Sequence, residues 1–191
     1  LTLYLDNRSF KDLLVANDEI NQEHLDTFME PSDKNLRDVI LNMVIAGRDT
    51  TAQALSWCFY RMCIHPETQK KLREEALHVL TSTGELEKLK NNHAKGAIAF
   101  ESTQQMKYIE AFVMEVLRFH PSVPKEAKEV HADDTLPDGT AVHKGDIVAF
   151  IPWLMGRDTE LWGPDALEFR PERFLEQPKP SPFKFIAFQA G

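Results

Sequence analysis

The residues whose types and spacing could do chemistry begin with an acid and an alcohol inside an apolar segment. Asp49 and Thr50 lie near the middle of "LRDVILNMVIAGRDTTAQALSW", which runs from Leu36 to Trp57. A carboxylate beside a hydroxyl, facing an apolar space, forms a short path for protons. Gly47 has no side chain and would let a large ligand approach the backbone closely. The pattern predicts general acid chemistry beside a bound molecule.

A long helix must position these residues. Its apolar residues recur at spacings of three and four, and a second apolar face lies beside the first, so we expect a helix buried nearly all round. The two faces comprise Leu36, Val39, Ile40, Met43, Val44 and Gly47, and Leu41, Ile45 and Ala46. Gly47 and Thr50 are expected to break the helix. Glycine costs about 1 kcal/mol in a helix interior, and a threonine hydroxyl can bond the carbonyl four residues back.

The same residues have a simpler interpretation. Gly47 would then serve tight helix packing, while Arg48 and Asp49 would form an ion pair that reaches solvent. Spacing alone leaves both interpretations open.

A second pair with chemical potential is Glu115 and Arg118 in "MEVLRFHP". On a helix they are neighbours at i and i+3, and a solvated pair of this kind contributes about 0.2–0.5 kcal/mol. The alternative is a buried pair in which the five donors of the arginine hold another part of the chain. Arg173, between the aromatic residues of "FRPERF", is predicted to anchor a loop.

Helix spacing and proline positions predict the other helices. The long helix should end near His65, because a proline suits the first turn of a second helix over about Pro66 to Leu80. A third helix is expected over about Thr103 to His120. Ser102 and Gln105 would form a capping box at its start.

Turn residues and β-branched residues dominate other parts of the chain. A polar surface loop, with room for one helical turn, is expected over Thr81 to Glu101. The Pro-Asp-Gly turn in "TLPDGTAV" and the run "DIVAFIPW" predict a hairpin or small sheet between about Val130 and Leu154. The segment after it is rich in proline and glycine and should be mostly ordered loop. The fold class is therefore mainly α with a small β-sheet region, and residues 1–191 are expected to belong to a single domain.

Composition and charge exclude several classes of protein. Of the 191 residues, 42% are apolar and 27% are charged, as in a globular protein. The net charge of -8 and the lack of a basic stripe argue against nucleic-acid binding. Cys58 and Cys63 fall in an apolar helical run, which excludes a disulfide framework. No apolar run reaches the about 18 residues that cross a bilayer. The chain begins on Leu1 rather than Met, which suggests a piece of a longer protein.

In their order along the chain, these motifs resemble the cytochrome P-450 family of haem-thiolate monooxygenases. "AGRDTT", Ala46 to Thr51, is similar to the oxygen-binding motif on the family's long central helix. Glu115-x-x-Arg118 is similar to its Glu-x-x-Arg helix, and "PERF", Pro171 to Phe174, to its Pro-Glu-Arg-Phe loop. "HPETQKKLREE" and "MKYIEAFVMEVLRFHPSVP" also match. The resemblance covers about residues 32–191 and implies a partial cytochrome P-450 fold, whereas residues 1–31 match poorly.

The end of the sequence resembles the family's haem-binding loop. "FQAG", Phe188 to Gly191, is similar to the first four positions of Phe-x-x-Gly-x-Arg-x-Cys-x-Gly, whose cysteine thiolate ligates the haem iron. The resemblance places that metal ligand four residues after Gly191, and Cys58 and Cys63 lie in the wrong context to replace it. Because the thiolate favours O–O cleavage, residues 1–191 alone are expected to be inactive. The missing N-terminal part is expected to hold the membrane anchor.

The resemblance also implies roles for single residues. Thr50 would form a groove for O2 and steady it, and Asp49 would relay protons to it. The cofactor-binding set would be Ala46, Gly47, Lys128, Phe188 and Gly191, with Lys128 meeting a haem propionate. The structural triad, far from substrate, would be Glu115, Arg118 and Arg173.

Cofactors and partners follow from the same resemblance. They are haem b (iron protoporphyrin IX), O2, and NADPH electrons delivered by a flavoprotein of the P-450 reductase type. Three segments are most similar to the fatty-acid and alkane ω-hydroxylase branch, which implies a long aliphatic substrate oxidised at or near its terminal carbon. Met43 to Ile45 and Ser122 to Ala127 are candidate pocket lining. The parent protein would lie on the cytosolic face of the endoplasmic reticulum membrane.

Two alternatives stay open. A family member that rearranges peroxides without O2 would need no proton relay, and the Asp49–Thr50 pair argues against it. The other alternative, from another class, is a haem-free helical interaction protein or a catalytically dead fragment or pseudogene product. Loaded with hemin, residues 1–191 as they stand are expected to show no thiolate-type Soret shift with carbon monoxide.

Overall fold

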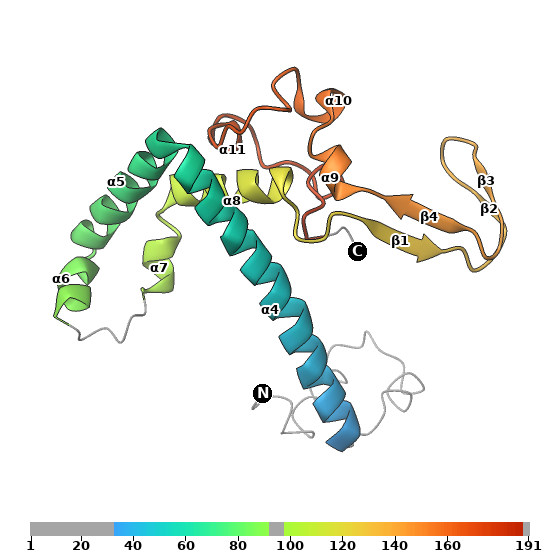
Figure 1. The fold of residues 1–191 in the computed structure, drawn as a ribbon, viewed down its shortest axis with the longest axis horizontal. Coiled ribbons are helices and arrows are strands. Elements are labelled where there is room, and N and C mark those ends of the chain that lie inside the picture. The colour runs from blue at the N-terminus through green and yellow to red at the C-terminus, as the bar shows by residue number, and fades with distance from the viewer. Residues whose placement is uncertain (1–32, 92–97, 189–191) are drawn as a thin grey trace, which may run out of the picture. The chain divides into compact units, whose positions relative to one another are not determined.

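A computed structural model of the chain describes residues 33–91 and 98–188. By its internal contacts the chain divides into two compact units, Leu1–Gly47 and Arg48–Gly191. The described residues of the first unit form the N-terminal part of helix α4 (Asp33–Ile64). The second unit holds the rest of α4 and every other described element (Figure 1).

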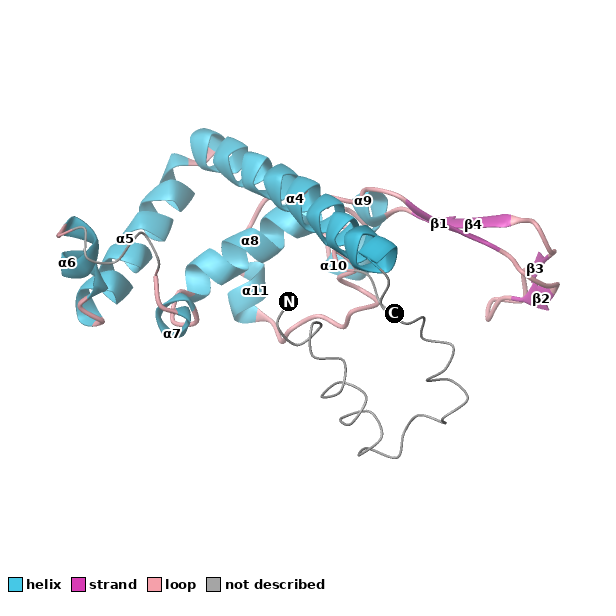
Figure 2. Ribbon diagram, turned by 90° about the horizontal axis from the view of Figure 1, so that it is seen from below, coloured by secondary structure: helices cyan, strands magenta, loops and turns pink. Residues whose placement is uncertain are grey.

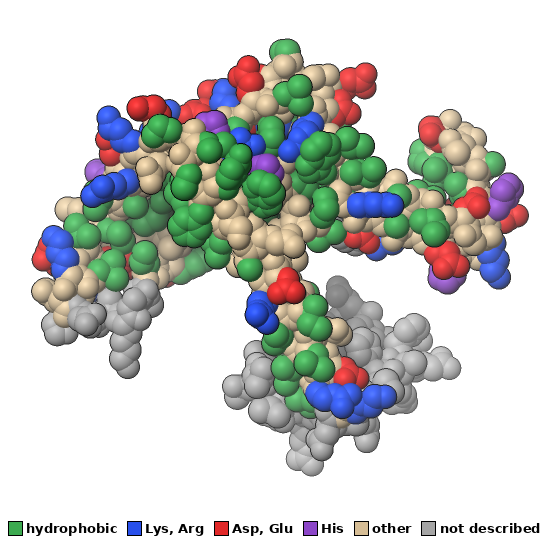
Figure 3. Space-filling model, in the orientation of Figure 1, with side chains coloured by type: hydrophobic (Ala, Val, Ile, Leu, Met, Phe, Trp, Pro, Cys, Tyr) green, Lys and Arg blue, Asp and Glu red, His purple; other side chains and the backbone are tan. Residues whose placement is uncertain are grey.

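Helix α4 differs from the sequence prediction in two ways. It runs without interruption from Asp33 to Ile64, so the predicted helix break is wrong. The cost of one glycine is small beside the cooperative gain of extending a helix through 32 residues. The prediction of burial nearly all round is also wrong, because apolar side chains along α4 are exposed in the described structure (Figure 3). They include Ile40, Leu41, Met43, Val44, Ile45, Leu55 and Phe59.

The helix boundaries after α4 follow the proline signal. Helix α5 (Pro66–Ser82) has its proline in the first turn, where a missing N–H breaks no helical bond. Among the described residues of the predicted loop over Thr81 to Glu101, Glu85–Lys90 forms the short helix α6, and α7 (Phe100–Thr103) begins at the end of the range. Residues 92–97 lie outside the described part of the chain.

Helix α8 (Lys107–Phe119) begins later than predicted and has a different cap. Ser102 lies inside α7, so the predicted capping box with Gln105 is wrong. The carboxylate of Glu75, from α5, instead accepts the N–H groups of Tyr108 and Ile109, both over 2.8 Å. A negative charge is favourable at a helix N-terminus, which has free N–H donors. Tertiary contact therefore supplies the cap that local sequence was expected to supply.

Two apolar clusters form the core of the second unit. In the first, Cys58 of α4 and Leu72 of α5 pack on Phe112 and Val116 of α8. In the second, Val79 and Leu80 near the end of α5 pack on Met106. The C-terminal part of α4 is thus joined to α5 and α8 through one shared core.

Two antiparallel ribbons form in and just before the predicted range of about Val130 to Leu154, because the first strand precedes it (Figure 2). Strand β1 (Glu126–Glu129) pairs with β4 (Ile147–Phe150), with Ala127 opposite Ala149. Strand β2 (Asp134–Thr135) pairs with β3 (Ala141–Val142) around the Pro-Asp-Gly turn. Gly139 in that turn has a φ of 88°, which glycine adopts without strain.

The segment after β4 is mostly loop, as predicted. Three short helices interrupt it: α9 (Pro152–Met155), α10 (Thr159–Trp162) and α11 (Arg173–Glu176). Gly156, after α9, lies so close to the end of α8 that a Cβ there would collide with the carbonyl oxygen of Arg118. The loop is therefore closely fitted to α8.

Candidate functional site

The first predicted group lies on successive positions of α4. A side chain at Gly47 would meet nothing within 4 Å, so the backbone there is open. Arg48 and Asp49 are exposed by 80% and 72% and form an ion pair at 4.0 Å, which is the simpler of the two interpretations above. Thr50 is partly buried. In the described part of the chain, the Asp49 side chain is therefore accessible to solvent, and Thr50 lies at the edge of a packed region.

The second group is a buried ion pair, so its interpretation as a solvated surface pair is wrong. Arg118 and Glu115 have fully buried side chains. Arg118 Nε donates to Glu115 Oε2 over 2.6 Å, and Arg118 Nη2 donates to Glu115 Oε1 over 2.7 Å. Two parallel bonds of this kind are the strongest arrangement of arginine with a carboxylate.

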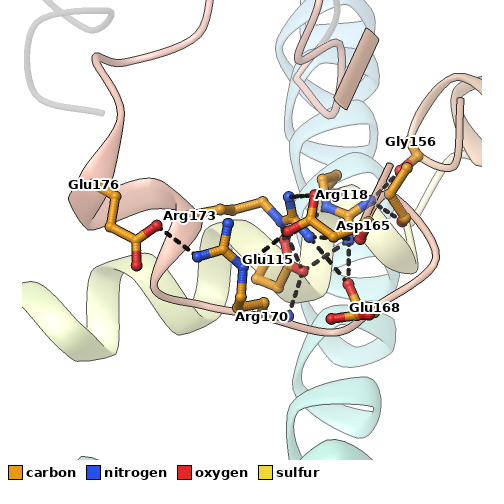
Figure 4. A network of polar contacts seen from close by, with 9 residues as sticks. Glu115, Arg118, Gly156, Asp165, Glu168, Arg170, Arg173 and Glu176 are labelled. Carbon is orange, nitrogen blue, oxygen red and sulfur yellow. Dashed lines mark hydrogen bonds and ion pairs between the residues drawn. The ribbon is translucent and has the colours of Figure 1, made fainter. Parts of the chain in front are cut away.

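Arg173 completes this group from a distant part of the sequence (Figure 4). Its Nε donates to Glu115 Oε1 over 3.2 Å, and its side chain is 2% exposed. The backbone N–H of Arg170 donates to the same oxygen over 2.7 Å. Glu115 therefore accepts bonds from three residues, and the structure brings the predicted Glu115, Arg118 and Arg173 together.

Arg118 binds the loop between α9 and α11 through its remaining donors. Its Nη1 donates to the carbonyl oxygens of Gly156 and Ala166, the latter over 2.8 Å, and its Nη2 donates to that of Glu168 over 3.0 Å. Arg173 Nη2 also donates to the Glu168 carbonyl, over 3.2 Å. The network thus joins α8 to the loop with charge-assisted bonds.

Asp165 balances the second arginine charge. It pairs with Arg173 Nη1 at 3.2 Å and with Arg170 Nε at 2.9 Å. Burial alone would raise the pKa of Asp165, but hydrogen bonds from Arg173 and Arg170 outweigh it and hold this pKa below its usual value. Two carboxylates and two buried guanidinium groups therefore share one connected network.

A corner of arginine, histidine and aromatic rings lies where α8 ends. His120 stacks on Trp57 with ring centroids 3.8 Å apart, and Arg61 Nε donates to His120 Nε2 over 3.0 Å. Burial lowers the pKa of His120 to about 4, and the charges of Arg61 and Arg157 act in the same direction. Arg61 and Arg157 also lie over the Phe119 ring, at 4.5 and 4.1 Å. His120 is thus held neutral, with Nε2 as an acceptor.

The other predicted cofactor residues are not gathered at one place. Lys128 lies on β1, is exposed, and forms an ion pair with Glu126 at 3.5 Å. Phe188 is exposed and lines a groove of about 480 Å³ between α8 and the loop after α11, together with Met114 and Phe185. Gly191 lies outside the described residues.

Sequence reasoning missed Asp165, Arg170 and the backbone carbonyls that bind Arg118. Arg170 stands in the quoted "FRPERF", and its two ion pairs could have been suspected from that motif. Asp165 is a single loop acid after Gly-Pro, and no spacing relates it to a distant helix. Only the folded chain shows that these groups meet.

The family of the chain follows from its match to known sequences. A family model described as Cytochrome P450 matches residues 4–191. The chain belongs to the cytochrome P-450 family. The match begins at residue 4, so the family model extends further toward the N-terminus than the predicted range of about residues 32–191. The mainly helical fold with small two-stranded sheets is consistent with part of the fold of this family, as predicted.

Curated relatives of this cytochrome P-450 chain come from plants and a fungus. Cytochrome P450 704C1 of Pinus taeda is 48% identical over 170 residues, which cover 84% of this chain and 32% of the relative. Cytochrome P450 86B1 of Arabidopsis thaliana is 39% identical over 183 residues, which cover 94% of this chain and 32% of the relative. The Mycosarcoma maydis monooxygenase cyp1 is 40% identical over 160 residues, which cover 83% of this chain and 24% of the relative. The chain thus spans about a third or less of the length of these relatives.

Haem is the cofactor of the cytochrome P-450 family, and the face of α4 beside Gly47 fits a flat apolar group. The space next to Gly47 is open, and Met43 and Val44, four and three residues before it on the same helix face, are exposed apolar side chains. A glycine at this point allows a large ring system to touch the helix backbone. Within residues 33–91 and 98–188, no helix is apolar over enough of its length to cross a membrane.

Proposed function

We propose that the complete protein is a haem-dependent monooxygenase that hydroxylates long aliphatic chains, such as fatty acids or alkanes, at or near the terminal carbon. Residues 1–191 are part of its single catalytic domain. It uses O2 and NADPH electrons delivered by a flavoprotein reductase, on the cytosolic face of the endoplasmic reticulum membrane. Membership of the cytochrome P-450 family supports the reaction class.

One observation carries the proposal for the reaction. An acid and an alcohol, Asp49 and Thr50, follow Gly47 on α4 at a point where the backbone is open and the neighbouring side chains are apolar. A bound haem supplies the activation of O2, which no side chain can supply. Asp49 is accessible enough to exchange protons with water, and Thr50 lies next to it at the packed edge. These two residues are proposed to deliver protons to the oxygen side of the haem.

The buried network has a different role. Glu115, Arg118 and Arg173 carry fixed charges inside the protein, and none of them is exposed by more than 2%. Such a network is shielded from water and bonds the backbone of a distant loop, so we assign it to positioning. It holds the loop after α9 against α8, and that loop leads to Phe188, where the haem-binding loop would begin.

The substrate class rests on the resemblance to ω-hydroxylases and on apolar side chains near the proton path. Met43 and Val44 are exposed on the face of α4 that carries Gly47 and would face a long hydrocarbon chain. A hydrocarbon gains about 0.8 kcal/mol for each methylene removed from water. An apolar face of this kind therefore suits a long aliphatic substrate better than a polar one.

The test uses the complete protein with haem, a P-450-type reductase, NADPH and a series of fatty acids and alkanes. We expect a thiolate-type spectrum with carbon monoxide and a terminal hydroxyl product that depends on NADPH. Product formed without NADPH from a fatty acid peroxide would instead identify a peroxide-rearranging enzyme. A complete protein with no thiolate-type spectrum would be catalytically dead.

Matched variants test the proton path. Asp49→Asn and Thr50→Ala should lower the hydroxylation rate by about tenfold or more, at the low end of the effect of acid–base groups. Asp38→Asn is the control for the first, because Asp38 also pairs with the arginine before it on α4, at 2.8 Å. Thr51→Ala is the control for the second, because Thr51 is exposed. Full activity in both site variants would contradict the proposed path.

A further inference from the structure

Ser122, three residues after the end of α8, bonds directly to helix α4. Its hydroxyl donates to the backbone carbonyl oxygen of Thr50 over 2.9 Å. In an α-helix this carbonyl also accepts the N–H of Ala54, so Ser122 adds a second donor. Carbonyls that bond outside their own helix tilt away from its axis, and the helical bond lengthens slightly. Ser122 therefore acts on the helical turn that begins at Thr50.

This bond belongs to a corner in which the end of α8 contacts one face of α4. Thr50, Trp57 and Arg61 share that face, because seven and eleven residues correspond to two and three helical turns. Trp57 stacks on His120 at 3.8 Å, and Arg61 bonds His120 at 3.0 Å. The turn at Thr50 is thus fixed to the same corner as the two turns that follow it.

The end of α8 is a rigid support for Ser122. Glu115 and Arg118 are fully buried in the charged network, four residues and one residue before α8 ends at Phe119. Pro121 is buried and has a fixed φ, so little freedom separates the helix from Ser122. The hydroxyl of Ser122 is therefore held in place by the buried network on one side and by α4 on the other.

We propose that Ser122 is a positioning residue for the proton path, acting through the carbonyl of Thr50. Its bond fixes the tilt of the turn that begins at Thr50, and so fixes where the Thr50 hydroxyl points beside Asp49. The proposal rests on the function proposed above, because the orientation of this turn affects the reaction only if these residues deliver protons. Without the bond the turn samples more orientations, protons arrive less reliably, and O2 with two electrons and two protons leaves as hydrogen peroxide.

The experiment compares three variants of the complete, haem-loaded protein. Ser122→Ala removes the hydroxyl, and Ser122→Thr keeps one. Ser56→Ala is the matched control, because the Ser56 hydroxyl also bonds a carbonyl of α4, that of Ala52 at 2.8 Å, but makes that bond within the helix. Two quantities are measured: the fraction of NADPH electrons found in product rather than peroxide, in H2O and in D2O, and amide hydrogen exchange over residues 50–58.

Ser122→Ala should lower the coupled fraction by about two- to tenfold and speed exchange at the Ala54 amide by a similar factor, as expected for one lost hydrogen bond. It should also change the D2O effect on coupling while substrate affinity stays the same. Ser122→Thr should restore both quantities, and Ser56→Ala should change neither. A change in substrate affinity alone would mean that Ser122 only lines the substrate pocket, and would overturn the proposal.

Failure of the two proposals can be told apart. If Asp49→Asn and Thr50→Ala lose coupling while Ser122→Ala keeps it, the proton path stands and Ser122 has no positioning role. If Asp49→Asn and Thr50→Ala both keep full coupling, the proton path is wrong and the role of Ser122 is overturned with it.

Discussion

Replacing Glu115 by glutamine would remove one negative charge from the buried network while keeping the size of the side chain. The Glu115 carboxylate accepts two bonds from Arg118, one from the Arg173 side chain and one from the Arg170 backbone. A glutamine amide has one acceptor oxygen in place of two, and its NH2 group would face guanidinium donors. The change therefore breaks hydrogen bonds to the arginines and places the donors of the new amide opposite the donors of the guanidinium groups.

The size of the effect follows from burial. Arg118 and Arg173 are both exposed by 2% or less, and after the change only Asp165 would balance their two charges. Removing one partner of a buried ion pair leaves an uncompensated charge and costs about 3–5 kcal/mol. We expect Glu115→Gln to lower the free energy of unfolding by this amount, which is a large part of the stability of a typical domain.

The assay is urea unfolding of the complete protein, followed by far-ultraviolet circular dichroism. The control is Glu110→Gln on the same helix. Glu110 also pairs with a residue at i and i+3, Lys107 at 3.1 Å, but both side chains are 65% exposed. An exposed pair of this kind contributes about 0.2–0.5 kcal/mol, so the control should shift the urea midpoint very little.

A loss below about 1 kcal/mol for Glu115→Gln would refute the reasoning, because it would mean that the charges of Arg118 and Arg173 are compensated without this carboxylate. Equal losses in Glu115→Gln and Glu110→Gln would contradict it as well. Burial would then not be what separates the two pairs.

Three further predictions concern stability. Between pH 6.5 and 4 the unfolded chain holds a proton on His120 that the folded protein lacks, since burial and nearby arginines lower the folded pKa to about 4. The free energy of unfolding should therefore fall as pH falls, by up to about 1.4 kcal/mol per pH unit from this group. Measured by urea unfolding at a series of pH values, it should depend less on pH in His120→Gln, whereas His131→Gln, at an exposed histidine, should behave like the unchanged protein. Gly156→Ala should cost about 1–3 kcal/mol and lower the Tm, because the new Cβ would collide with the Arg118 carbonyl. Glu75→Ala should cost about 0.5–2 kcal/mol in urea unfolding, because two N–H groups in the first turn of α8 lose their acceptor; an unchanged midpoint would show that water replaces the cap.

Local signals in the sequence were sufficient for the three long helices and for the Pro-Asp-Gly turn. Pro66 marked the start of α5, because proline fits a first helical turn and few other helical positions. The Pro-Asp-Gly turn marked the β2–β3 ribbon, because Gly139 needs a positive φ. Signals of this kind depend on residues close together in the sequence, so they can be recognised without knowledge of the fold.

Signals that depend on contact between distant segments were misjudged or left open. The capping box at Ser102 was a good local pattern, yet Glu75 of α5 caps α8. Spacing alone left the burial of Glu115 and Arg118 undecided, because an i, i+3 pair has the same sequence on a surface and in a core. The predicted break at Gly47 is wrong for a different reason. Helix formation is cooperative over many residues, and this gain outweighs the cost of one residue with a low helix propensity.

The sequence by itself determined the three long helices, the Pro-Asp-Gly turn and the family that the motifs resemble, because these depend on residue types at short, fixed spacings. Only the tertiary structure decided that Arg173 and Asp165 join Glu115 and Arg118, and that Ser122 reaches the carbonyl of Thr50. These contacts join residues far apart along the chain. Their energies depend on the burial that the folded chain creates, and no local pattern specifies that burial.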